Sequence, residues 1–153
     1  MRHADMDAAV TITNRVEGMR VPRKALERAA AAAVRAAGRR GVVLSVAVVG
    51  DAEMERLNER FLGRRLVTDV LSFELEPTSP DPAEPAGEVV VNGELARREA
   101  RSRGRPTRDE LALYVVHGVL HLFGFDDLTR DGARAMKMKE SEILSGLGLG
   151  SGR

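Results

Sequence analysis

The stretch from Gly41 to Gly50, GVVLSVAVVG, constrains the fold more than any other part of this 153-residue chain. It is an apolar run rich in β-branched residues, long enough for a buried strand and too short for a typical helix. A strand that is apolar on both of its sides needs cover on both faces. The run therefore predicts a sheet against which helices pack.

Helical and extended patterns alternate along the rest of the chain. Apolar residues three and four positions apart predict helices, which cover residues 23–37, 51–62, 94–103, 107–123 and 131–144. Strands are predicted, beside the one at 42–49, over residues 9–16 at a sheet edge, 67–75 and 87–92. The alternation predicts an α/β or α+β sandwich in which helices cover a small sheet. Of the two we expect α+β, with a small mixed β-sheet in an αβα-type sandwich.

Local signals set the expected ends of these elements. Asp51 is placed to cap the helix that follows it, and Thr107 with Glu110 has the T-x-x-E spacing of a capping box. We expect residues 1–153 to form a single domain with a flexible tail over 146–153.

Composition excludes several classes of protein. No stretch approaches the roughly 20 apolar residues of a membrane span, and the N-terminal residues lack the apolar segment of a signal peptide. We therefore expect a cytoplasmic protein. The chain contains no cysteine, so a metal site would need His, Asp or Glu ligands.

Charge is distributed unevenly although the net charge is only +1. Residues 76–87, EPTSPDPAEPAG, hold four of the six prolines and predict an exposed acidic loop. Residues 23–40 and 97–108 are rich in arginine, which suits bidentate phosphate contacts if the two stretches share a face. Solvated helix faces are the alternative.

Two of the three histidines, His117 and His121, lie four residues apart in the apolar run VVHGVLHLFGFDD. On a helix this spacing directs both imidazoles at one point, as in helical two-histidine zinc sites. Two ordinary buried histidines are the alternative. HExxH peptidases carry glutamate after the first histidine, where this chain has Gly118, which argues against a peptidase of that type and leaves the general base unassigned.

The surroundings of the pair favour a metal site. Gly118 costs a helix interior about 1 kcal/mol relative to alanine, which indicates a close approach there. Gly124 ends the helix, and the turn delivers Asp126 and Asp127, either of which could add a carboxylate. Two imidazoles and one carboxylate leave a coordination position open for water, whose pKa a divalent metal lowers from about 15.7 to about 7.

The segment HGVLHLFGFDD resembles the signature H-G-x-L-H-L-x-G-[YF]-D-H of the YbeY family, metal-dependent single-strand endoribonucleases of ribosomal RNA maturation and ribosome quality control. The segment LNERFLGRRLVTDVLSFEL resembles the family's L-N-x-x-[YF]-R-G-x-x-x-P-T-D-V-L-S-F-P, and GEVVVN resembles its G-[DE]-[IV]-x-[IV] strand. These matches keep the family's order from about residue 42 to residue 142.

The resemblance implies one zinc ion held by His117, His121 and Asp127, with Asp127 in place of the family's third histidine. Aspartate can ligate zinc, but it is a harder ligand, so Mn²⁺ or another divalent metal is an alternative. In a further alternative, Asp127 caps the following turn and the site holds no ion.

A second departure concerns RNA binding. Leu62 replaces an arginine that the resemblance assigns to the RNA phosphate. Arg64 and Arg65 could supply a guanidinium instead, or could be solvated loop residues. Thr68 and Ser72 belong to a strand that flanks the metal cleft in the family and could contact substrate, although a strand-start cap is the plainer role.

The function implied by the resemblance is metal-dependent cleavage of single-stranded RNA. Its partners would be ribosomal RNA and the small ribosomal subunit or its assembly factors. Arginines of 97–108 would hold the RNA backbone, and the scarcity of aromatic residues, 3% of the chain, argues against strong sequence readout. The alternative is an assembly factor that binds the ribosome or its RNA with weak or no catalysis. Hydrolysis of a non-nucleic substrate rests on fold analogy alone.

Overall fold

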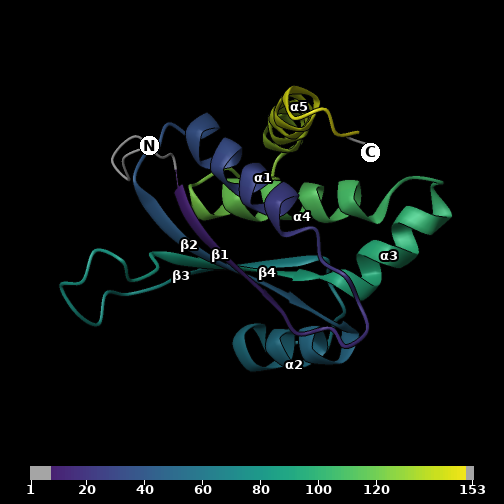
Figure 1. The fold of residues 1–153 in the computed structure, drawn as a ribbon, viewed down its shortest axis with the longest axis horizontal. Coiled ribbons are helices and arrows are strands. Elements are labelled where there is room, and N and C mark those ends of the chain that lie inside the picture. Colours follow the sequence, from purple (N-terminus) through teal and green to yellow (C-terminus); the bar gives the residue numbers. More distant parts are fainter. Residues whose placement is uncertain (1–7, 151–153) are drawn as a thin grey trace.

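The apolar run at 41–50 forms a strand of a four-stranded sheet in a computed structural model that describes residues 8–150 (Figure 1). The strands are β1 (Ala8–Asn14), β2 (Val42–Val49), β3 (Val70–Glu74) and β4 (Gly87–Asn92). The helices are α1 (Arg23–Ala36), α2 (Asp51–Leu62), α3 (Gly93–Ser102), α4 (Thr107–Leu122) and α5 (Arg130–Gly146). No helix within this described range is long and apolar enough to cross a membrane.

The sheet is mixed, with strand order β1-β2-β4-β3. β2 lies between β1 and β4 and is parallel to both, so that Val46 pairs with Ile12 on one side and Val89 on the other. β3 is antiparallel to β4 and forms an edge of the sheet. The predicted edge position of the first strand is confirmed.

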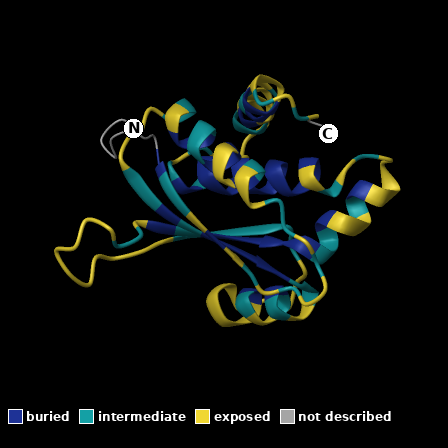
Figure 2. Ribbon diagram, in the orientation of Figure 1, coloured by how far each residue is buried: buried dark blue, intermediate teal, exposed yellow. Residues whose placement is uncertain are grey.

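Helices cover both faces of the sheet, as the apolar run requires. Leu44, Val46 and Val48 of β2 join the core beneath α1 and α4. Ala47 and Val49 alternate with them and pack toward α2 on the opposite face. α5 lies outside α1 and α4, and the central strands and α4 are the most deeply buried elements (Figure 2). The predicted α+β fold is confirmed as an αβα-type sandwich.

α4 is the central helix of this arrangement. It contacts β3 and β4 below it, α1 and α3 beside it, and α5 above. A helix covered on so many sides has to be apolar around most of its circumference. Its buried residues accordingly run without a break from Asp109 to Val116, and His117 ends this run as a partly exposed residue.

Asp51 does not cap α2, contrary to the sequence prediction. Gly50 is the N-cap residue, and Asp51 is the first residue of the helix. The Asp51 carboxylate accepts hydrogen bonds from Arg98 and Asn92, and its amide donates to Glu94 at 2.8 Å. The hydrogen bond from Arg98 lowers the pKa of Asp51 below its usual value. The carboxylate therefore joins α2 to α3 instead of closing its own helix.

The predicted capping box at the start of α4 is also wrong. Pro106 is the N-cap residue and no side chain caps the helix. Glu110 is buried and lies 3.7 Å from the guanidinium nitrogens of both Arg103 and Arg105. Leaving a buried carboxylate without a cationic partner costs more free energy than leaving a helix end without a side-chain cap. The Glu110 carboxylate therefore faces the two arginines and does not cap the helix.

The flexible tail predicted for residues 146–153 stays a prediction; its residues 151–153 lie outside the described range, and the part up to residue 150 contacts the rest of the chain. Leu147 and Leu149 pack against the core. The Gly150 amide donates to Asp109 at 3.2 Å, and Arg105 donates to the Gly150 carbonyl. The chain therefore contacts the core through Leu147 and Leu149 and the Asp109 carboxylate through Gly150.

The predicted close approach at Gly118 is present, and the neighbour is the sheet. A Cβ atom on Gly118 would lie 2.5 Å from Val89 Cγ1 and 2.8 Å from Val70 Cγ2. The Gly118 carbonyl accepts a hydrogen bond of 2.6 Å from the Ser72 hydroxyl. α4 therefore rests directly on β3 and β4 at the residue that follows His117.

We expect Gly118→Ala to lower the free energy of unfolding by about 1 to 3 kcal/mol, because overpacking of a buried contact outweighs the gain of about 1 kcal/mol in helix propensity. Urea denaturation measures the change. Gly146→Ala is the matched control, since a Cβ atom there meets nothing within 4 Å. A stable Gly118→Ala protein would show that the helix can rise from the sheet at no cost.

Candidate metal centre

His117 and His121 lie one helical turn apart near the C-terminal end of α4. Their ring centroids are 4.6 Å apart, and the ring planes meet at 72°. The His117 side chain is 15% exposed and that of His121 is 32% exposed. The two imidazoles therefore form an accessible pair where the buried helix reaches the surface.

The turn after α4 carries Asp127 back to this pair. Gly124 has φ of +97°, a conformation that favours glycine. The Gly124 amide donates to the His121 carbonyl at 3.1 Å, which keeps the turn against the helix end. Asp126 accepts a hydrogen bond from the Leu128 amide and so stabilises the turn itself. Asp127 is thereby left as the carboxylate that faces the histidines.

The three side chains converge on one point. The Asp127 carboxylate oxygens lie 3.9 Å from His117 Nε2 and 3.8 Å from His121 Nε2. One ligand atom of each residue lies within 4.8 Å of the others. Ligands at zinc distances of about 2.1 Å stand roughly 3.4 Å apart around a tetrahedral ion. The two spacings from Asp127 are only slightly wider than this, so side-chain movements would close the set around a cation.

Glu140 of α5 completes the site from behind, and the sequence interpretation missed it. Its side chain is 6% exposed, and its carboxylate is hydrogen-bonded to His117 Nδ1. With Nδ1 donating to Glu140, Nε2 of His117 carries the lone pair that faces Asp127. The sequence contains one signal that could have identified it: Glu140 is a charged residue on the apolar stripe of α5 that includes Met136 and Ile143, so its side chain is expected to be buried.

Two hollows flank the cluster. A groove of about 380 Å³ runs between the end of α4 and β3 and is lined by residues that include Ser72, Glu74 and His121. A second hollow of about 230 Å³ lies between α4 and α5, lined by residues that include His117 and Lys137. An ion held by the cluster would therefore be approachable from both sides.

Ser72 is the one predicted substrate contact that the structure places beside the histidines. Its hydroxyl is already used, because it donates to the Gly118 carbonyl at 2.6 Å. The Asn92 amide of β4 donates to the Asp69 carbonyl, and the Leu75 amide donates to Ala86, which precedes β4. Because bonded and unbonded pairs alternate along an antiparallel ladder, the backbone of Ser72, three residues from both Asp69 and Leu75, points away from β4 at this edge of the sheet. Ser72 can therefore present its amide and carbonyl to a ligand, rather than its hydroxyl.

The other predicted substrate contacts, Arg64, Arg65 and Thr68, lie at the α2 side of the sheet. Arg65 Nε lies 2.6 Å from Glu59, which raises the pKa of the guanidinium, and Arg64 is exposed in the loop after α2. Thr68 hydrogen-bonds Asp69 at 3.4 Å and its carbonyl accepts from Asn92. The described contacts of these residues tie them to α2 and β4, not to the histidines.

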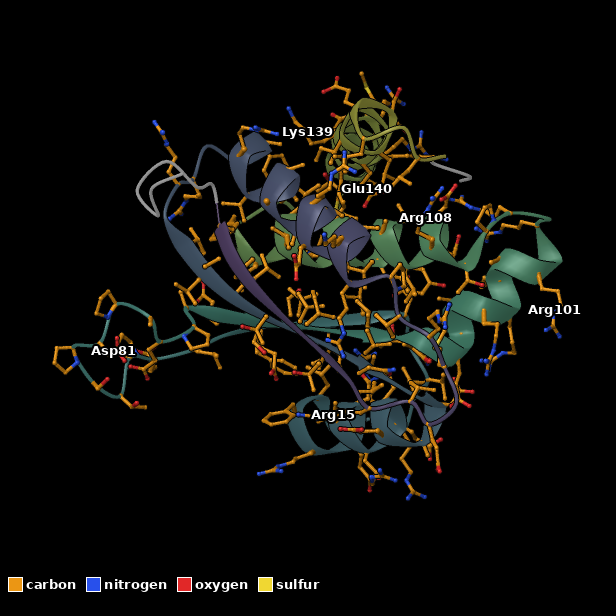
Figure 3. All side chains as sticks on the ribbon, in the orientation of Figure 1. Arg15, Asp81, Arg101, Arg108, Lys139 and Glu140 are labelled. Atoms are coloured by element: carbon orange, nitrogen blue, oxygen red, sulfur yellow. The ribbon has the colours of Figure 1, made fainter. Side chains whose placement is uncertain are left out.

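The arginines of 97–108 lie toward the N-terminal end of α4, away from the histidine cluster. Arg108 is thirteen residues before His121, which corresponds to about 20 Å along the helix. Figure 3 shows Arg101 and Arg108 on the side of the molecule opposite the loop that carries Asp81. Arg98 and Arg108 also pair with Asp51 and Asp109. Arg108 is therefore too far away to contact a phosphate at the histidine cluster, and the expectation that residues 97–108 hold the RNA backbone elsewhere stays a prediction.

Comparison with known proteins matches this arrangement to one family. The family model described as "Endoribonuclease YbeY" matches residues 11–148, a wider span than the motifs alone covered. An endoribonuclease YbeY of Alkalilimnicola ehrlichii is 43% identical over 131 residues, which are 84% of this chain and 79% of that protein. One of Acidothermus cellulolyticus is 42% identical over 112 residues, 67% and 68% of the two chains.

A solved structure supports the fold. The solution structure of TM1509 from Thermotoga maritima aligns with a TM-score of 0.55 at 23% identity. The alignment covers 90% of this chain and 91% of that one. At this identity the likeness concerns the fold alone, and it agrees with the sheet and helix layers described above.

Glu140→Gln should weaken divalent-metal affinity about tenfold to a hundredfold, because a neutral amide is a poorer acceptor for the His117 Nδ1 proton. Competition with a chromophoric chelator measures the dissociation constant. Glu142→Gln is the control on the same helix, since the Glu142 side chain is 66% exposed and pairs with Lys139. Equal metal affinity in both variants would show that Glu140 serves only the packing of α5.

Proposed function

The chain belongs to the YbeY endoribonuclease family, and from this we propose that it is a metal-dependent hydrolase that cuts single-stranded RNA internally. Endoribonucleases of this family act in ribosomal RNA maturation and ribosome quality control, and we propose the same process for this chain. The observation that carries the proposal is the convergence of His117, His121 and Asp127 on one point beside two open hollows.

His117, His121 and Asp127 would hold the ion, which we propose to be zinc, with Mn²⁺ as the alternative that a carboxylate ligand favours. When bound, such an ion supplies Lewis-acid chemistry: it polarises a phosphoryl oxygen and lowers the pKa of water to about 7. Three protein ligands leave room for water and substrate, whereas a structural zinc site closes all four positions.

The protein's own residues supply position and proton control. Glu140 holds the Nδ1 proton of His117 and so keeps the ring in one tautomer and one orientation. The Gly124 turn fixes Asp127 opposite both rings. The contact of Gly118 with the sheet fixes the distance between the ligands and the β3 groove. A substrate phosphate therefore meets a site that needs little rearrangement.

Weak selectivity for sequence follows from the same surfaces. Aromatic residues make up only 3% of the chain, so few rings are available for stacking bases. Contacts to phosphates and to the exposed edge of β3 do not distinguish one base from another. We propose that ribosomal RNA, in the cytoplasm and in association with the small subunit or its assembly factors, presents the unpaired strand that is cut.

The two departures from the family motif favour one rival function. Leu62 removes a cation and Asp127 changes a ligand, so the chain could bind ribosomal RNA as an assembly factor with little catalysis. This rival predicts RNA binding that survives removal of the metal ligands while cleavage stays at background.

Cleavage of an unstructured, fluorescently labelled oligoribonucleotide by the metal-loaded protein tests the proposal. We expect internal cuts that a chelator abolishes and zinc or Mn²⁺ restores, and a fall in rate of about a hundredfold or more in His117→Ala, because one of three ligands is lost. Metal content by mass spectrometry should fall in parallel.

Circular dichroism of His117→Ala separates loss of the ligand from loss of the fold, and Glu142→Gln serves as the active control. Cleavage that persists through both chelation and His117→Ala would reject a metal mechanism. Binding without cleavage in the metal-loaded wild-type protein would establish the assembly-factor alternative instead.

A further inference from the structure

The hollow between α4 and α5 has a cation at its rim. Lys137 lines this hollow together with His117, Asp127 and Glu140. It lies on α5 three residues before Glu140, a spacing that places both side chains on one side of the helix. Its side chain is exposed, so the ammonium can meet a ligand that enters the hollow.

Lys137 has no carboxylate partner among the ion pairs of residues 8–150. Its near neighbour Lys139 lies 3.9 Å from Glu142 and is engaged along the helix surface. Both lysines belong to α5, but Lys139 pairs with a carboxylate, whereas Lys137 lines the hollow. Lys137 is therefore the ammonium of this pair that remains available at the metal cluster.

Charge balance at the cluster gives this ammonium a role. The two positive charges of a divalent ion would be offset by the carboxylates of Asp127 and Glu140, with both imidazoles neutral. A histidine in place of Asp127 would leave one positive charge to attract a phosphodiester. Lys137 restores that charge next to the altered ligand.

The opposite side of the cluster is acidic. Glu74 lines the β3 groove and is exposed, and the loop that follows β3 carries further carboxylates at Glu76, Asp81 and Glu84. Phosphates would be repelled along this side. The charges of the two hollows therefore favour the α5 side for the sugar-phosphate backbone.

We propose that Lys137 binds an RNA phosphate next to the scissile bond and thereby directs the RNA backbone along α5. This inference rests on the proposed endoribonuclease function. It assigns to α5 the phosphate contact that Leu62 cannot make at the end of α2, and it makes Lys137 a substrate-binding residue, with no part in holding the metal.

The test compares Lys137→Met, Lys137→Arg and the control Lys139→Met, each loaded with zinc, on an unstructured fluorescein-labelled oligoribonucleotide. Lys137→Met should raise KM about fivefold at low salt and leave kcat within about twofold, since one phosphate contact is lost. The slope of log kcat/KM against log salt should become shallower by about 0.7, the value for one phosphate on a single strand.

Lys137→Arg should keep the wild-type slope, and Lys139→Met should change neither KM nor slope. Zinc affinity should be equal in all four proteins, which separates substrate binding from damage to the metal site. An unchanged KM and slope in Lys137→Met, with wild-type cleavage intact, overturns this inference and leaves the proposed function standing.

Failure of the proposed function looks different. If the wild-type protein cleaves nothing, fluorescence anisotropy of the uncut RNA gives the salt slope of binding directly. A shallower slope in Lys137→Met then supports the phosphate contact in a protein that only binds RNA, and an equal slope rejects it.

Discussion

The contact between Gly118 and the sheet is the constraint on which the site depends. α4 can lie on β3 and β4 only because residue 118 has no side chain, since a Cβ atom would come within 2.5 Å of Val89. The adjacent His117, and His121 one turn later, take their height above β3 from this contact. Glycine destabilises a helix interior. At position 118 it also permits the close contact with the sheet that places the metal ligands at the rim of a groove.

Two carboxylates serve the cluster in different ways because they differ in burial. Asp127 is 47% exposed and stands in a turn, where it can adjust to an ion and to solvent. The Glu140 side chain is 6% exposed and is hydrogen-bonded to the ring nitrogen of His117 that faces away from the ligand point. A buried carboxylate is stable only with a partner. The His117 imidazole satisfies Glu140, and Glu140 in turn fixes the imidazole.

Local sequence signals predicted what is local in the structure. The end of α2 at Leu62, the helical pairing of His117 and His121, and the return of a carboxylate after Gly124 follow from spacing and from one glycine turn. The choice of Asp127 over Asp126 came from the family resemblance. Glu140 could not be found this way, because its partner lies on another helix and its meaning depends on how α5 docks on α4.

The capping box failed for the same reason. Glu110 satisfied a local pattern, but the approach of Arg103 and Arg105 gave its carboxylate a different use. Whether residues 97–108 lie near the histidines depends on how α3 packs against α4, and the sequence does not predict that packing. On the α2 side, Leu62 is exposed and Arg65 is paired with Glu59, which leaves Arg64 as the exposed guanidinium of that loop, whereas Lys137 of α5 lines the hollow beside the metal cluster. An ion whose charge is neutralised by two carboxylates attracts phosphate only weakly. α5 therefore carries both Glu140, which orients His117, and Lys137, the cation that we propose for the substrate phosphate.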